Sequence, residues 1–145
     1  MLRVTKMTDY ASMLLACLAQ HPDRVHSASE LAELSRLELP TVSKVLKPLS
    51  RAGLIEAFRG SQGGYRLARP ASAITLFDVV EAIEGRLEMT ECSGEHSLCE
   101  LEHHCGIQGH WQKINDVIGN ALKSASIAEM GPARRKSIPL KLAKA

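Results

Sequence analysis

The chain has 145 residues, of which 45% are apolar, which is enough for one domain with a core of its own. No stretch approaches the ~20 apolar residues that a membrane-spanning helix needs, so we expect no membrane partner. With 18 basic and 16 acidic residues the net charge is only +2, which by itself indicates no class of partner.

The charges are nevertheless unevenly distributed. Seven basic and two acidic residues lie between positions 36 and 69, whereas eight acidic residues and one basic residue lie between positions 78 and 102. The first region favours a polyanion, and the second should stay away from phosphate. An acidic setting also raises the pKa of thiols, so cysteines in the second region need a bound cation to stay deprotonated.

The first predicted helix runs from about 8 to 20, with Thr8 as its N-cap. Its apolar residues recur at steps of three and four, at Tyr10, Met13, Leu14, Cys17 and Leu18. Cys17 is predicted to be a small buried residue of the core rather than a ligand.

Residues 14–17 resemble the cleavage box of a lipoprotein signal. The apolar stretch at this position covers only 11–16, however, which is shorter than the ~7 to 15 apolar residues that an export signal needs. We therefore expect a cytoplasmic protein, in which stable disulfides are disfavoured.

A helix-turn-helix is predicted next. Ser27 and Glu30 form a capping box that opens a helix through about Ser35, with Leu31 and Leu34 facing inward. Pro40 suits the first turn of a third helix that ends before Gly53. Its inward positions are Val42, Val45, Leu46 and Leu49, and Pro48 should kink or loosen it. The opposite face, predicted to enter the major groove, carries Thr41, Ser43, Lys44 and Lys47.

Residues 54–58 and 65–67 are predicted to pair as a β-hairpin, because they flank a glycine-rich turn. A hairpin that directly follows a helix-turn-helix is typical of a winged helix. Its tip offers Arg59, Ser61 and Gln62 to DNA, and Arg59 has the charge and reach for phosphate or a narrow minor groove.

Two further helices are predicted. Thr75 and Asp78 cap a helix that Gly85 should end. A helix of about eighteen residues begins near position 111, with a narrow apolar seam near heptad spacing. This seam is expected to pair with its counterpart in a homodimer, although it could also pack on its own core. Its residues are Trp111, Ile114, Ile118, Ala121, Leu122 and Ala125.

The predicted fold class is therefore mainly α with a small β-hairpin wing: a winged helix-turn-helix plus a long dimerisation helix. We expect a DNA-binding domain over 1–85, a cysteine-containing loop over 86–110, the dimerisation helix over 111–130, and a disordered tail over 131–145, whose charged residues are all basic.

The cysteine-containing loop carries Cys92, Cys99 and Cys105, spaced C-x6-C-x5-C. Thiolate sulfur suits both zinc and the iron of iron-sulfur clusters, and each intervening loop is long enough to turn back. The spacing lies outside the familiar patterns of either, so it does not choose the metal. An enzyme is not expected, because no Ser-His-Asp arrangement, phosphate loop or dinucleotide fingerprint can be assembled, and no small-molecule substrate is implied.

Several short strings together resemble winged-helix iron-sulfur transcription regulators of the IscR and NsrR type, over positions 1 to about 130. The nearest likeness is to the branch that regulates Suf-system cluster assembly. The strings are Thr8-Asp9-Tyr10-Ala11, Leu39-Pro40-Thr41-Val42-Ser43-Lys44-Val45-Leu46, Arg51-Ala52-Gly53-Leu54, Arg59-Gly60 and Gly63-Gly64-Tyr65-Arg66-Leu67, together with the three cysteines.

This resemblance implies that the three cysteines ligate a 2Fe-2S or 4Fe-4S cluster and that Arg59 reads the minor groove. Asp9 matches the position from which a carboxylate of the partner subunit supplies the fourth ligand. It is also a first-turn acid of a kind that commonly stabilises a helix dipole. Where relatives have a histidine, this chain has Gln108, whose amide coordinates iron poorly. The remaining rivals for the fourth position are His103, His104 and His110.

The expected function is a homodimeric repressor whose affinity for a double-stranded DNA operator depends on an iron-sulfur cluster, with cluster-assembly genes among its targets. Two alternatives stay open. One is a repressor that senses nitric oxide or redox state on the same scaffold, and the other is a zinc-stabilised DNA-binding or interaction module.

Overall fold

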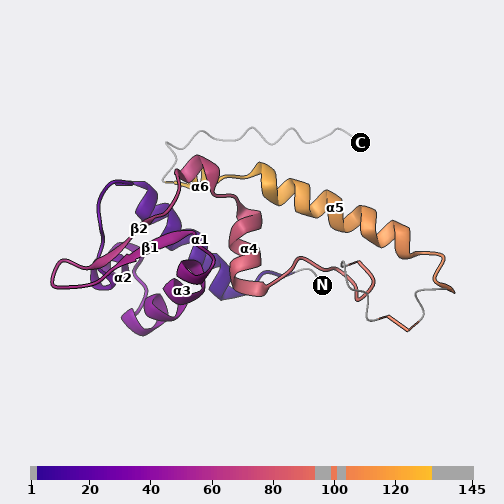
Figure 1. The fold of residues 1–145 in the computed structure, drawn as a ribbon, viewed down its shortest axis with the longest axis horizontal. Helices are drawn as coiled ribbons and strands as arrows, with labels where there is room; N and C mark the ends of the chain where they lie inside the picture. Colours follow the sequence, from indigo (N-terminus) through magenta and orange to yellow (C-terminus); the bar gives the residue numbers. More distant parts are fainter. Residues whose placement is uncertain (1–2, 94–98, 101–103, 132–145) are drawn as a thin grey trace, which may run out of the picture.

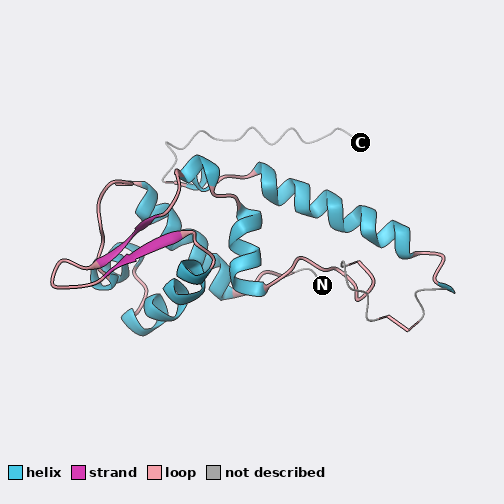
Figure 2. Cartoon of the chain, in the orientation of Figure 1, coloured by secondary structure: helices cyan, strands magenta, loops and turns pink. Residues whose placement is uncertain are grey.

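The computed structural model describes residues 3–93, 99–100 and 104–131. In chain order the elements are α1 (Lys6–Ala19), α2 (Ala28–Ser35), α3 (Leu39–Arg51), β1 (Ile55–Phe58), β2 (Gly64–Leu67), the 3-10 turn η1 (Ala71–Ala73), α4 (Leu76–Glu84), α5 (Gln108–Ser124) and α6 (Ile127–Met130). Helices dominate and the two strands form one hairpin, which confirms the predicted fold class (Figure 2). None of the described helices is long and apolar enough to cross a membrane.

The molecule has a globular end and an arm. Helices α1 to α3, the hairpin and α4 form the globular end, and α5 extends away from it on the side opposite the hairpin tip (Figure 1). One apolar core joins the helices of the globular end. Leu14, Leu15 and Leu18 of α1 meet Leu31 of α2 and the inward face of α3 there, all at most 1% exposed. Burying each such side chain stabilises the fold by about 1.5 to 3 kcal/mol.

Helix α1 begins earlier than the sequence predicted. Thr5, not Thr8, is its N-cap residue, and the Thr5 hydroxyl accepts a hydrogen bond from the backbone N–H of Thr8 at 3.4 Å. Thr8 itself is only 3% exposed. Both threonines have a hydroxyl that can cap a helix, so the sequence alone does not choose between them. Thr8 is not the cap because its hydroxyl donates a hydrogen bond to Glu84 of α4, a contact that the local sequence does not reveal.

The helix-turn-helix forms as predicted, with two local differences. Ser27 and Glu30 make the capping box, and Arg36 ends α2 in the left-handed conformation with φ 57°. Leu34 is 54% exposed rather than inward, because the core contacts of α2 are made by Leu31 and Ser35, which are its buried residues. Helix α3 continues past Pro48 to Arg51, since Val45, Leu46 and Leu49 anchor both sides of the proline in the core.

The hairpin pairs β1 and β2 antiparallel, with Ile55 opposite Leu67 and Phe58 opposite Gly64. A third extended segment lies beside it: the backbone N–H of His26 donates to the carbonyl of Tyr65 at 2.9 Å, and the N–H of Tyr65 donates to the carbonyl of His26 at 2.7 Å. The wing is thus fixed to the link between α1 and α2.

The predicted eighteen-residue helix from position 111 is wrong in its limits. Helix α5 begins three residues earlier, at Gln108, and ends at Ser124. The chain then returns to the globular end, where Ser126 and Thr75 form an isolated antiparallel β-bridge. The N–H of Ile127 donates to the carbonyl of Ile74 at 2.8 Å. Ile127, in α6, is fully buried in the core, so the end of the predicted dimerisation helix packs with the winged helix. The predicted basic tail lies outside the described residues except for Gly131.

Candidate functional site

The outer face of α3 presents the side chains that the sequence assigned to the major groove. Lys44 and Lys47 are exposed, whereas Thr41 and Ser43 are half-buried at its edge. The opposite face is closed into the core by Val42, Val45, Leu46 and Leu49. A rigidly packed helix with two exposed cations on its outer side can lie in a groove between phosphates.

The wing tip offers a second polar and basic surface. Arg59, Ser61 and Gln62 are all exposed, and Gly60 adopts a φ of 106°, which favours glycine. Arg66 is engaged within the hairpin, since it lies 5.0 Å over the Phe58 ring and pairs with Glu56 at 2.9 Å. The Arg59 guanidinium makes no hydrogen bond or ion pair with the described residues, so its charge is available to a ligand.

The root of the wing contains a histidine that sequence reasoning missed. His26 is 1% exposed, and neither ring nitrogen has a hydrogen-bond partner among the described residues. Burial, followed by the nearby charge of Arg24, lowers the pKa of His26, which keeps the ring neutral. Gly64 packs so closely against it that a Cβ there would lie 2.3 Å from the His26 carbonyl oxygen. No local pattern could reveal this contact, because 38 residues separate its two sides.

The cysteine segment, defined here as residues 86–107, connects α4 to the far end of α5 (Figure 1). Cys92 is 7% exposed, and its sulfur lies 3.3 Å from the Thr90 hydroxyl. Cys99 and Cys105 are half-buried, and His104 and His110 are exposed. His103 lies outside the described residues. Within residues 3–93, 99–100 and 104–131, no three His, Cys, Asp or Glu side chains lie close enough to hold a metal ion.

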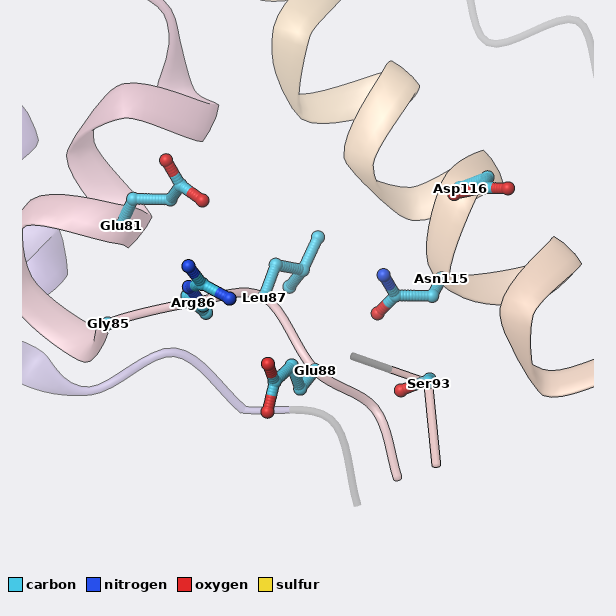
Figure 3. A pocket seen from close by; sticks show the side chains of 8 residues that line it. All are labelled: Glu81, Gly85, Arg86, Leu87, Glu88, Ser93, Asn115 and Asp116. Carbon is cyan, nitrogen blue, oxygen red and sulfur yellow. The ribbon is translucent and has the colours of Figure 1, made fainter. Parts of the chain in front are cut away.

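A polar pocket of about 630 Å³ lies where the cysteine segment leaves α4 (Figure 3). Three carboxylates line it, from Glu81, Glu88 and Asp116, and Asn115 extends into it from α5 toward Leu87. The Asn115 side-chain oxygen accepts a hydrogen bond from the N–H of Met89 at 3.2 Å. This contact holds the start of the cysteine segment against α5.

Asp9, the predicted partner ligand, is exposed in the first turn of α1. It lines a more apolar pocket of about 410 Å³ between α1, α4 and the ends of α5 and α6. Beside it, Thr5 and Thr8 hydrogen-bond Glu84 of α4. The hydrogen bond from Thr8, and then those from Thr5, lower the pKa of Glu84, so this carboxyl is ionised at neutral pH.

Helix α5 uses two faces differently. On one face Gly119 lies against Phe77 and Leu87, and the Lys123 ammonium lies 4.4 Å over the Phe77 ring. On another face large apolar side chains are 39 to 64% exposed, and these define the α5 apolar face: Ile107, Trp111, Ile114 and Val117. Ile107 and Val117 were not in the predicted seam, whereas its later members Ile118, Leu122 and Ala125 are half-buried.

Residues 4–132 match the family model Rrf2, described as an iron-dependent transcriptional regulator. The chain is 38% identical over 135 residues to Protein aau3 of Rhizobium meliloti (strain 1021), covering 92% of this chain and 87% of that protein. It is 34% identical over 110 residues to the HTH-type transcriptional regulator NsrR of Shouchella clausii (strain KSM-K16), covering 74% of each.

Two solved structures resemble the fold. T. potens IscR superimposes with a TM-score of 0.66 at 28% identity, over 89% of this chain and 85% of that one. CymR, the global cysteine regulator of B. subtilis, superimposes with a TM-score of 0.69 at 24% identity, over 90% and 96%, and shows the fold alone. These matches confirm the resemblance that the sequence motifs indicated. The chain belongs to the Rrf2 family, and it is a DNA-binding winged-helix transcription regulator rather than an enzyme.

Proposed function

We propose that the protein is a homodimeric repressor whose operator affinity depends on an iron-sulfur cluster bound by Cys92, Cys99 and Cys105. The observation that carries the proposal is the position of these cysteines: all three lie on one segment that joins the winged helix to α5, in a chain of an iron-dependent family. Their donor chemistry fits a 2Fe-2S or 4Fe-4S cluster, since thiolates are the usual ligands of cluster iron.

The fourth ligand in this proposal is the partner's Asp9. An exposed carboxylate in the first turn of α1 is accessible to a second subunit, and a hard oxygen donor completes a set of three thiolates without a histidine. When bound, the cluster supplies a redox-sensitive link between subunits. The cysteine segment and α1 then hold the two recognition helices at one half-site spacing, and the cluster-free protein samples several.

Purification without oxygen tests the cofactor. We expect a brown protein that contains iron and acid-labile sulfide in cluster stoichiometry, and a higher operator affinity in one cluster state than in the other. The DNA probe is the duplex that the wild-type protein selects from a random-sequence library. A colourless protein with stoichiometric zinc would instead identify a zinc-stabilised module.

The targets that we propose are genes of iron-sulfur cluster assembly. A regulator of those genes that itself binds an iron-sulfur cluster responds directly to the supply of clusters that the genes maintain. Mapping the bound genomic sites tests this proposal, and sites confined to genes of nitric oxide or redox defence would favour a sensor of those signals on the same scaffold.

Arg59→Ala is expected to weaken binding to the selected duplex more than binding to unrelated DNA. The exposed guanidinium at the wing tip has the charge and reach to enter a narrow minor groove. The width of the minor groove depends on the DNA sequence, so this contact can distinguish one duplex from another. We expect the free energy of binding to the selected duplex to weaken by about 1 to 3 kcal/mol, as measured by fluorescence anisotropy titrations. Arg69→Ala is the matched control, because Arg69 lies beyond the hairpin and pairs with Asp78 at 3.6 Å. Equal losses on both DNAs would contradict a reading role for Arg59.

Val117→Lys is expected to dissociate the dimer. Val117 is 64% exposed on the α5 apolar face, which a second copy can cover. A symmetric interface contains the position twice, so the dissociation constant should rise roughly a hundredfold or more. Sedimentation velocity measures the change. Asn120→Lys adds the same charge to an exposed polar position of α5 and should leave the dimer intact. A Val117→Lys variant that stays dimeric would place the interface elsewhere.

A further inference from the structure

A carboxylate from α4 closes the N-terminal end of α1. Oε1 of Glu84 accepts hydrogen bonds from the backbone N–H of Thr5 at 3.0 Å, from the Thr5 hydroxyl at 2.7 Å and from the Thr8 hydroxyl. Thr5 is the N-cap residue of α1, so the negative charge lies at the positive end of the helix dipole. Thr8 is only 3% exposed, so the contact reaches from the surface into the interior.

The two partners of this contact lie next to different parts of the proposed sensor. Glu84 is the last residue of α4, and after Gly85 the chain enters the cysteine segment. Asp9, the proposed ligand for the partner's cluster, directly follows Thr8 in the first turn of α1. Helix α1 in turn packs against the recognition helix α3 in the core. Helix α4 itself packs against both α1 and α3, and Glu84 adds to that packing a polar contact between the start of the cysteine segment and the first turn of α1.

We propose that Glu84 is a positioning residue that couples the cysteine segment to the DNA-binding helices by holding the first turn of α1 against the end of α4. The inference rests on the proposed function, because it describes how a change in the cysteine segment reaches α3. A displacement of the segment pulls on Gly85 and Glu84, and the three hydrogen bonds pass that displacement to α1.

Glu129 shows what a merely local cap looks like in the same chain. Its carboxylate accepts hydrogen bonds from the N–H of Ser126 at 2.7 Å and from the Ser126 hydroxyl at 3.0 Å, three residues away. Glu84 does similar chemistry, but across 79 residues between two separate helices. The pair supplies matched variants: Glu84→Ala breaks a contact between helices, and Glu129→Ala breaks a contact within one turn.

Hydrogen exchange on the cluster-free, full-length protein tests the contact without any metal. In Glu84→Ala we expect faster amide exchange at residues 5–9 and at residues 86–92 together, roughly tenfold, because the lost bonds are charge-assisted. Glu84→Gln keeps an acceptor oxygen and should restore part of the protection. In Glu129→Ala the increase should stay within residues 126–130. Faster amide exchange at residues 5–9 with no change at residues 86–92 would show that Glu84 stabilises only the N-terminus of α1. That result would overturn the proposal.

The second measurement is the ratio of affinities for the selected duplex between cluster-loaded and cluster-free protein. Glu84→Ala should bring this ratio closer to one, by roughly two- to thirtyfold, when wild type and variant are compared at equal iron and sulfide content per protein. Glu129→Ala should keep the wild-type ratio. An unchanged ratio in Glu84→Ala would overturn the inference and leave the proposed function standing. A wild-type protein without a cluster would overturn the proposed function, and the exchange experiment would then decide whether Glu84 couples the two segments.

Discussion

Cys99→Ala is expected to abolish cluster binding while leaving the winged helix folded. Cys99 is half-buried in the cysteine segment and belongs to none of the helices or strands, so its loss removes a ligand without opening the core. Protein purified without oxygen should lose its visible absorption, its iron and its sulfide, and its operator affinity should equal that of the cluster-free wild type. Circular dichroism should show unchanged helical content.

Cys17→Ala is the matched control for this prediction. Cys17 lies in α1 with 8% exposure, and burial raises the pKa of its thiol, as expected for an inert core cysteine. Its replacement should lower stability by about 1 kcal/mol and keep the full cluster content. A Cys99→Ala protein that unfolds would instead indicate a metal that holds the fold together, as zinc does in small modules.

Gly64→Ala is expected to detach the wing. The new Cβ would lie 2.3 Å from the carbonyl oxygen and 2.6 Å from the carbonyl carbon of His26, which are backbone atoms with no freedom to rotate away. The strands must separate, and the two hydrogen bonds between His26 and Tyr65 weaken with them. Overpacking together with the lost hydrogen bonds should lower the free energy of unfolding by about 3 kcal/mol.

A fall in melting temperature of roughly 10 °C should accompany this loss, as measured by differential scanning calorimetry. Specific DNA binding should fall as well, because Arg59 is carried by the same hairpin. Gly106→Ala is the control, since a Cβ at Gly106 meets nothing within 4 Å. A Gly64→Ala protein with wild-type melting temperature would show that the link between α1 and α2 moves aside without cost.

Local sequence patterns were enough for most of the helices. The capping boxes at Ser27 and Thr75 depend on residues three positions apart, and both form as predicted. The inward face of α3 is also a local pattern, because a period of 3.6 places its apolar residues on one side. Such features follow from neighbours along the chain, which is why a single sequence reveals them.

Contacts between distant segments were beyond the same reasoning. The N-cap of α1, the burial of His26 and the break between α5 and α6 each depend on a partner far along the chain: Glu84, Tyr65 and Ile74. The α5 apolar face shows the same limit, since the periodicity of a helix does not say which apolar side packs inward.

By itself the sequence determined the helix-turn-helix, the basic wing and the three cysteines of one segment, because spacing along the chain defines each of them. Only the tertiary structure decided which side of α5 stays exposed, how the wing is attached to the link between α1 and α2, and which carboxylate closes α1. Those outcomes depend on which surfaces meet when the chain packs, and a packed core selects among faces that are equally apolar in the sequence.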